Sequence, residues 1–249
     1  MPNQKYCIAN WKMNFTLSNA ESFIQNWENK SLTNTSVKTV ICPSFTELSK
    51  VGQMLNGSGT ELGAQNVSEE SKGAFTGEIS CENLQEMGCK WVIVGHSERR
   101  GIMGESDVKI ASKVRRILNK NLFPILCIGE TIEERNEGKT QLVLSRQLSA
   151  VIEYISPADF NRMVVAYEPV WAIGTGVNAT VDIISETHQK IRNIVSELGF
   201  NSEKLPILYG GSVSDSNAEE LAKIKGVDGF LIGGASLDAE KFYSIYKQL

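Results

Sequence analysis

The sequence predicts one closed barrel of eight parallel strands, each followed by a helix, which spans residues 1–249. Two observations support this (β/α)8 fold: short apolar runs recur along the chain, and helical patterns separate them. No Pro/Ser-rich linker divides the chain, although its length also fits two small domains or a doubly wound open sheet. The count of runs favours the barrel. The expected strands are residues 6–9, 37–42, 60–64, 91–94, 123–128, 163–167, 207–209 and 230–232.

The strand and helix patterns differ in period. Residues 91–94 and 163–166 are apolar without strict alternation, which is typical of parallel strands covered on both faces. The segment after residue 180 instead places apolar residues on one helical stripe, and Gly199 follows it as a predicted C-cap. That stripe consists of Ile184, Ile191, Ile194, Val195 and Leu198.

Composition narrows the classes of function. The chain has 25 basic and 29 acidic residues, a net charge of −4, and no long run of either sign, so neither nucleic acid nor an anionic membrane is an expected partner. No signal peptide precedes residue 6 and no apolar run is long enough to span a bilayer, which predicts a cytoplasmic protein with a small soluble ligand. The odd cysteine set lacks a C-x-x-C pair and is interpreted as reduced core residues: Cys7, Cys42, Cys81, Cys89 and Cys127.

Polar residues follow the predicted strands abruptly. In a barrel of this kind the active site lies at the carboxyl ends of the strands, so residues just after each run are the candidates. We therefore expect these side chains to meet on one rim. They are Asn10, Lys12, Gln65, Asn66, His96, Glu98, Glu130 and Glu168, with glycine pairs at residues 210–211 and 233–234.

The two glycine pairs favour a phosphate site. Each precedes a segment that could open a helix, at Ser212 and at Ala235, where unpaired N–H groups would favour an anion. For either pair alone, a tight turn is the simpler explanation. Two pairs after neighbouring strands shift the interpretation towards phosphate.

Glu168 and His96 are the candidate acid–base groups. Glu168 shares the parity of Val164 and Ala166, so it is expected at the barrel mouth, partly desolvated and more basic than in water, with a structural ion pair as the alternative. His96 begins a predicted helix whose dipole disfavours the imidazolium and leaves a neutral donor. The other histidine, His188, lies by an apolar helical stripe and is expected to be a packed or surface residue.

Lys12 and the segment after Glu168 complete the predicted site. Lys12 offers a fixed positive charge for a phosphate and for a developing oxyanion, although a lysine after a strand is often only solvated. Residues 169–176 carry Trp171 and Ile173 between a proline and two glycines, which is typical of a hinged lid. Two nucleotide-like patterns are set aside: the glycines of residues 174–179 stand six residues beyond the strand, and residues 133–140 have Glu133 where the first glycine is required.

Seven blocks of the sequence resemble the triosephosphate isomerase family and cover nearly the whole chain in order: residues 10–14, 63–66, 73–80, 95–100, 166–176, 209–212 and 229–236. The resemblance implies a TIM barrel that interconverts dihydroxyacetone phosphate and D-glyceraldehyde 3-phosphate through an enediolate, in glycolysis and gluconeogenesis. It implies no metal and no organic cofactor.

The resemblance also assigns roles residue by residue. Glu168 would be the proton-shuttling base and His96 the neutral electrophile, while Asn10 and Lys12 would bind substrate. The implied phosphate donors are Gly174, Ser212, Gly233 and Gly234.

The resemblance further implies a homodimer in which the loop of residues 65–80, with Thr76 near its centre, reaches the neighbouring subunit near Asn10 and Lys12. Residues 67–71 and 101–103 depart from the family pattern. The resemblance therefore does not predict the detailed contacts with the partner subunit or the properties of the lid.

Two rival functions fit the same barrel. A metal-dependent sugar-phosphate epimerase would need a cluster of His and Asp ligands at the strand ends, yet His96 is the only histidine predicted there. A catalytically silent barrel that binds a phosphorylated ligand would show the same residue types.

Overall fold

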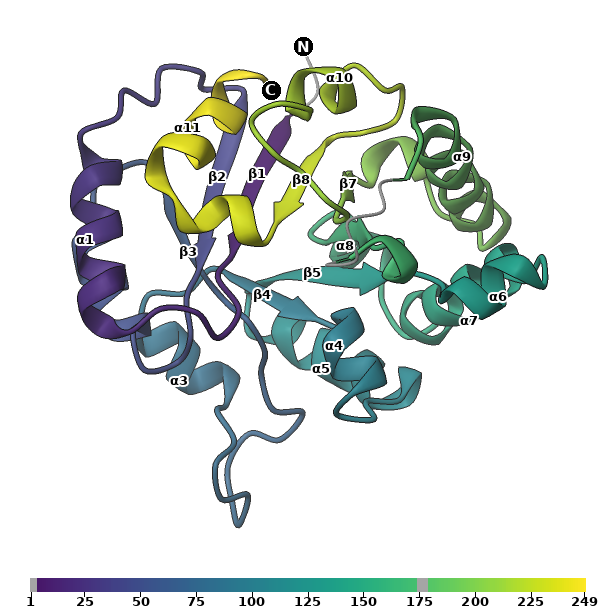
Figure 1. Ribbon diagram of the computed structural model, residues 1–249. Helices are drawn as coiled ribbons and strands as arrows, with labels where there is room; N and C mark the ends of the chain where they lie inside the picture. The colour runs from purple at the N-terminus through teal and green to yellow at the C-terminus, as the bar shows by residue number, and fades with distance from the viewer. Residues whose placement is uncertain (1–3, 174–178) are drawn as a thin grey trace.

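The strands of the computed structural model, which describes residues 4–173 and 179–249, close into a barrel (Figure 1). Spatial order follows chain order, neighbours pair in parallel, and β1 also pairs with β8. The predicted (β/α)8 barrel is therefore confirmed, and each predicted run matches its strand to within one residue at either end. The strands are β1 Lys5–Asn10, β2 Val37–Cys42, β3 Glu61–Ala64, β4 Trp91–Val94, β5 Phe123–Ile128, β6 Val164–Tyr167, β7 Ile207–Tyr209 and β8 Gly229–Ile232.

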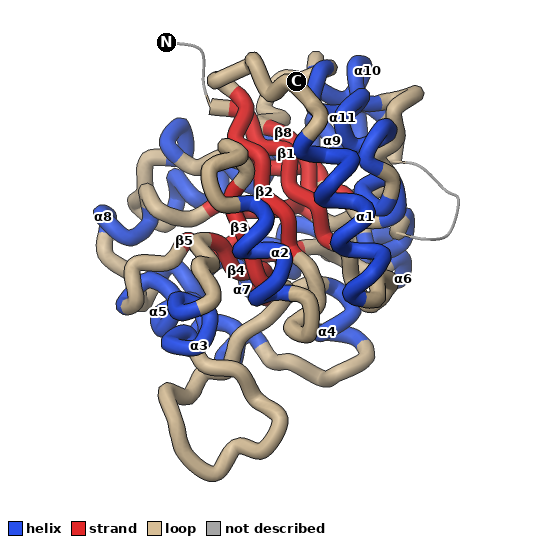
Figure 2. Tube along the Cα trace, turned by 90° about the vertical axis from the view of Figure 1, so that its left-hand side faces the viewer, coloured by secondary structure: helices blue, strands red, loops and turns tan. Residues whose placement is uncertain are grey.

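Helices form a layer around the strands, which occupy the centre of the molecule (Figure 2). The helices are α1 Leu17–Glu28, α2 Leu48–Leu55, α3 Cys81–Glu86, α4 Ser97–Gly101, α5 Asp107–Asn119, α6 Ile132–Asn136, α7 Thr140–Ile152, α8 Pro157–Phe160, α9 Val181–Glu197, α10 Ala218–Ala222 and α11 Ala239–Lys247. Three 3-10 turns are η1 Val170–Ala172, η2 Ser202–Lys204 and η3 Gly234–Leu237. Over the residues that the structure describes, no helix has the length and apolarity needed to cross a membrane.

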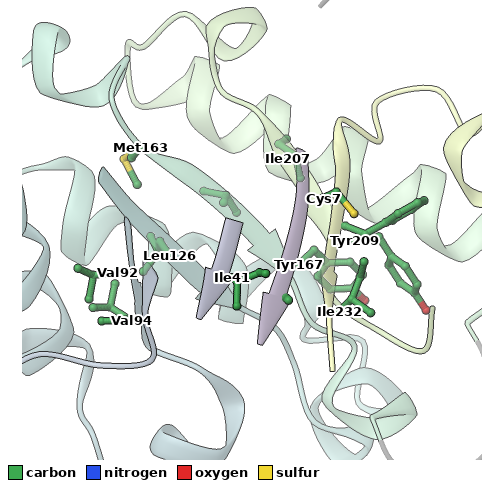
Figure 3. Packing of buried hydrophobic residues seen from close by; sticks show 14 of the residues in the cluster. Cys7, Ile41, Val92, Val94, Leu126, Met163, Tyr167, Ile207, Tyr209 and Ile232 are labelled. Atoms are coloured by element: carbon green, nitrogen blue, oxygen red, sulfur yellow. The ribbon is translucent and has the colours of Figure 1, made fainter. Parts of the chain in front are cut away.

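Alternation along the strands produces two apolar cores. Outward residues such as Ile41, Leu126 and Tyr167 pack under the helices in one large cluster (Figure 3). Inward residues, among them Ile93 and Val164, fill the barrel itself. All five cysteines are buried and unpaired, as predicted.

Aromatic rings fill the amino-terminal end of the barrel. The Trp91 ring stacks on Phe123 with centroids 4.9 Å apart, and Tyr6 meets Trp91 edge-on at 5.9 Å. Each of the three residues stands at or near the start of its strand. These rings pack across the amino-terminal end of the barrel axis.

An extended loop, residues 65–80 between β3 and α3, leaves the body of the molecule (Figures 1 and 2). We call it the arm. Phe75 near its tip is 46% exposed. A hollow of about 600 Å³ lies between the arm and the side chains of Asn83 and Arg116, so this larger cavity lies away from the residues predicted to carry chemistry.

Candidate active site

A cavity of about 280 Å³ opens at the carboxyl ends of the strands. It gathers residues that follow β1, β4, β6, β7 and β8, as expected for the active end of a barrel. Of the predicted site residues, Asn10, Lys12, His96, Glu168, Ser212, Gly233 and Gly234 line it. The remaining one, Gly174, lies outside the described residues. Ile173 of the predicted lid and Ala235 also line the cavity, and the lining residues that the sequence did not single out are Val213 and Leu231.

Glu168 continues the inward side of β6 after Val164 and Ala166, and only 2% of the residue is exposed. One carboxylate oxygen accepts the Ser97 backbone N–H at 2.8 Å. The other lies 3.0 Å from His96 Nε2. The alternation that builds the barrel core thus delivers a buried carboxylate to an imidazole.

The coupling of Glu168 to His96 overturns two expectations about their proton affinities. Burial raises the pKa of the Glu168 carboxyl, but the His96 ring and the Ser97 N–H outweigh it and the pKa is lowered. Burial lowers the pKa of His96, but the carboxylates of Glu168 and Glu98 raise it above its usual value. The expectations of a more basic Glu168 and of a depressed His96 pKa were wrong, because each considered one group without its partner.

The His96 ring is oriented by the start of α4, where it is the N-cap. Its Nδ1 accepts the Glu98 N–H at 3.3 Å, which leaves Nε2 to donate towards Glu168. With Nδ1 as acceptor the ring carries one proton, on Nε2, whereas the raised pKa favours a second proton on Nδ1. A proton on Nδ1 would instead face the Glu98 carboxylate, 3.4 Å away.

Lys12 has a backbone conformation that is rare outside glycine, with φ at 51°. Three side chains hold it there: Asn10 accepts its N–H at 3.1 Å, while Ser44 and Gln65 donate to its carbonyl at 3.2 and 2.8 Å. Its ammonium group pairs with Glu98 at 2.7 Å. Strained backbone of this kind persists where surrounding contacts fix it, which is common in functional sites.

Glu98 was expected on the rim, but its pairing with Lys12 was not expected. That pairing joins the ends of β1 and β4, which are not adjacent in the barrel, and no sequence pattern records such a contact.

The glycine turns after β7 and β8 form one wall of the cavity. Gly233 adjoins Lys12, because a methyl group added to this glycine would lie 3.5 Å from the Lys12 side chain. The segment after β7 opens a helix only at its last residue, because α10 starts at Ala218 and not at Ser212. Asn217 explains the delay, since it accepts the Ser214 N–H and donates to the Ser212 carbonyl, which holds residues 212–217 in a turn. After β8, the short η3 does begin at Gly234.

The beginning of the predicted lid rests on Glu130, which is fully buried. Its carboxylate accepts from Tyr167, Trp171 and Arg135 at 3.1, 3.2 and 3.0 Å. Glu130 therefore faces the helix layer rather than the cavity. The sequence contains the information that predicts this orientation. Glu130 continues the alternation of the outward residues of β5, whereas Glu168 continues that of the inward residues of β6.

A (β/α)8 barrel with a carboxylate and an imidazole in contact, and an ammonium group beside two glycine turns, defines an enzyme class that moves protons on small anionic substrates. A sequence profile described as "Triosephosphate isomerase" matches residues 5–249. The chain is 47% identical to the triosephosphate isomerase of Aquifex aeolicus, over 97% of this chain and 98% of that one. It is 45% identical to that of Colwellia psychrerythraea, over 97% and 96%. The chain belongs to the triosephosphate isomerase family and is an isomerase.

Proposed function

We propose that the chain interconverts dihydroxyacetone phosphate and D-glyceraldehyde 3-phosphate through an enediolate, in glycolysis and gluconeogenesis. Glu168 carries the proton between adjacent carbons, while His96 and Lys12 stabilise the substrate oxygens. The observation that carries the proposal is the contact of 3.0 Å between Glu168 and His96 Nε2 inside a cavity of about 280 Å³.

Substrate binding would convert this pair into a base and an electrophile. A substrate carbonyl that accepts from His96 Nε2 takes that donor away from Glu168. Burial then raises the pKa of Glu168 with less opposition from His96. The proton affinity of Glu168 therefore rises at the moment when it must abstract a proton from carbon. The electron pair released from the C–H bond moves to the carbonyl oxygen, where His96 and Lys12 oppose the new charge.

The far end of the substrate would bind at the glycine turns. Backbone N–H groups at Ser212, Gly233 and Gly234, with Gly174 expected to join them, suit a phosphate, and Lys12 adds a positive charge beside Gly233. Asn10, 6% exposed, both lines the cavity and holds the Lys12 backbone. Lys12 would exchange its bond to Glu98 for substrate oxygens.

A direct assay tests the proposal. Purified protein is incubated with dihydroxyacetone phosphate and a chelator, and the product is followed by nuclear magnetic resonance. We expect conversion with chelator present, and a large loss in His96→Gln. Activity that chelator abolishes would favour the metal-dependent epimerase, and no conversion at all would favour a silent barrel.

We also propose that the protein is a homodimer, with the arm of one subunit reaching the site of the other. Apolar side chains stand exposed where such an arm would bind: Met13 is 93% exposed, Ile102 75% and Met103 65%. Met13 follows Lys12, and α4 ends directly before Ile102. The arm begins at Gln65, which donates to the Lys12 carbonyl, so arm and apolar residues adjoin one site.

Sedimentation tests the dimer. At micromolar concentration we expect a species of twice the chain mass, and Met103→Lys should shift it towards the monomer. Leu142→Lys is the matched control, since Leu142 is 66% exposed but lies on α7. A single species near 27.4 kDa for the unaltered chain would contradict the proposal.

Two further proposals concern organisation. Residues 1–249 form one domain, because strand pairing runs without interruption from β1 through β8 and back to β1. A cytoplasmic location is supported by five buried, unpaired cysteines, which suit a reducing compartment.

A further inference from the structure

The Arg100 side chain joins the ends of two strands. Arg100 belongs to α4, and its Nε donates to the Gly95 carbonyl at 2.7 Å while another guanidinium nitrogen donates to the Cys127 carbonyl at 3.1 Å. The third nitrogen binds Asp107, the first residue of α5, at 2.5 Å. Only 16% of the Arg100 side chain is exposed, and it does not line the cavity.

The Gly95 and Cys127 carbonyls lie just beyond the last residue pair between β4 and β5. The register between β4 and β5 ends at Val94 and Leu126, so Gly95 and Cys127 are the next residues on each strand. A planar guanidinium can hold several acceptors in fixed directions, which an ammonium group cannot. The Arg100 side chain therefore links the two strands one residue beyond their last backbone pair.

Gly95 makes this support necessary. It has a φ of +70°, and a methyl group added there would lie 2.9 Å from the Arg100 guanidinium. A glycine in this conformation has wide rotational freedom, and the next residue is His96. The N–H groups of Arg99 and Arg100 hold the His96 carbonyl, and the Arg100 side chain holds the Gly95 carbonyl that precedes it.

The second carbonyl belongs to Cys127, which lies beside the proposed base Glu168 in the barrel. Cys127 lies on the inward side of β5 and pairs with Ala166 of β6, two residues before Glu168. Burial, and next the Glu168 carboxylate, raise the pKa of the Cys127 thiol well above its usual value. One guanidinium thus holds both the peptide before His96 and the strand segment beside Glu168.

We propose that Arg100 is a positioning residue for the isomerisation: through the Gly95 and Cys127 carbonyls it fixes the direction of the His96 ring relative to Glu168. The inference rests on the proposed role of His96. A misplacement of about 1 Å in a reacting group can reduce the rate about 100-fold, so a contact outside the cavity is able to govern turnover.

The test compares Arg100→Met and Arg100→Lys with the control Arg146→Met. Arg146 also binds Asp107, at 3.0 Å, but it is 59% exposed and is not bonded to either carbonyl. For Arg100→Met we expect kcat to fall about 100-fold, with inhibition by inorganic phosphate unchanged because the phosphate turns lie on β7 and β8. Arg100→Lys should lose less, and Arg146→Met should keep the unaltered kcat.

The imidazole itself gives a second readout. The chain has two histidines, so ¹⁵N resonances of both rings can be followed, with His188 on α9 as an internal reference. In both Arg100 variants we expect the His96 signals to shift or broaden while those of His188 stay in place. The control should leave both rings unchanged.

The outcomes separate this inference from the proposed function. His96 signals and kcat that stay at their unaltered values in Arg100→Lys would overturn the inference, even if Arg100→Met does not fold. Unaltered kcat per folded molecule together with a lower melting temperature would also overturn it, because Arg100 would then be only structural. If the unaltered chain converts no dihydroxyacetone phosphate, the proposed function fails, while the ring signals still show whether Arg100 orients His96.

Discussion

The pKa of the single residue Glu168 depends on its contacts as much as on its burial. Only 2% of Glu168 is exposed, which alone would make it a stronger base, yet the contact with His96 at 3.0 Å lowers its pKa. Lys12 likewise depends on a neighbour, since its charge is paired with Glu98.

Substitutions at Glu168 test the base. Glu168→Gln keeps shape and polarity but accepts no proton, so kcat should fall about a thousandfold or more. Glu168→Asp withdraws the carboxylate by about one bond and should cost about 100-fold. Exchange of the substrate's carbon-bound hydrogen with deuterated solvent measures the step directly. Exchange at the unaltered rate in the Gln variant would place the base elsewhere, with Glu98 the next cavity-side carboxylate to examine.

Lys12→Met tests the fixed charge. Because 28% of the Lys12 side chain is exposed and it pairs only with Glu98 among the described residues, its loss should leave the melting temperature nearly unchanged. The variant should lose about 3 to 4 kcal/mol of transition-state stabilisation, seen as a fall in kcat/KM. Lys109→Met, which removes a surface pair with Glu69, is the control. A collapsed melting temperature with unaltered kinetics per folded molecule would make Lys12 structural.

Element scale: the turn after β5 shows how strand ends and helices fix the site together. Gln147 of α7 donates to the Gly129 carbonyl at 3.0 Å and accepts its N–H at 2.9 Å. On the other side the Glu168 carbonyl lies so close that a methyl group at Gly129 would meet it at 1.8 Å. The position of Glu168 thus depends on a helix and a glycine distant in sequence.

Gly129→Ala should therefore affect both stability and activity. The β6 end must move to accept the methyl group, at a cost of about 3 kcal/mol in the free energy of unfolding, and Glu168 moves with it. Gly101→Ala is the control, because nothing lies within 4 Å of a methyl group there. Urea unfolding and kcat measure the two effects. A Gly129→Ala protein as stable and active as the control would show that this turn does not position the base.

Whole-molecule scale: one buried histidine couples the fold to pH. His188 on α9 is completely buried, its Nδ1 donates to the Gly226 carbonyl at 2.9 Å, and its Nε2 has no hydrogen-bond partner among the described residues. Burial lowers the pKa of His188 from 6.5 to about 4. The folded protein therefore excludes a proton that the unfolded chain accepts.

This coupling predicts acid sensitivity. Because the folded pKa is the lower one, the stabilisation is fully present above pH 6.5 and is lost as the pH falls towards 4. The total loss is about 3 kcal/mol. Urea unfolding across this range should show it, and His188→Gln, which can still donate to the Gly226 carbonyl, should show a flatter profile. Parallel profiles for the two proteins would exclude His188 as the source.

The sequence by itself determined the barrel, the active end and most residues at the cavity, because these follow from local regularities. Apolar runs specify strands, alternation sends Val164, Ala166 and Glu168 inward, and polar residues after strands must share one rim. Only the tertiary structure decided how these groups affect one another. The pKa shifts of Glu168 and His96, and the bond from Lys12 to Glu98, arise between different strand ends. Electrostatic and hydrogen-bond energies depend on distances of a few ångströms, which the order of residues along a chain does not encode.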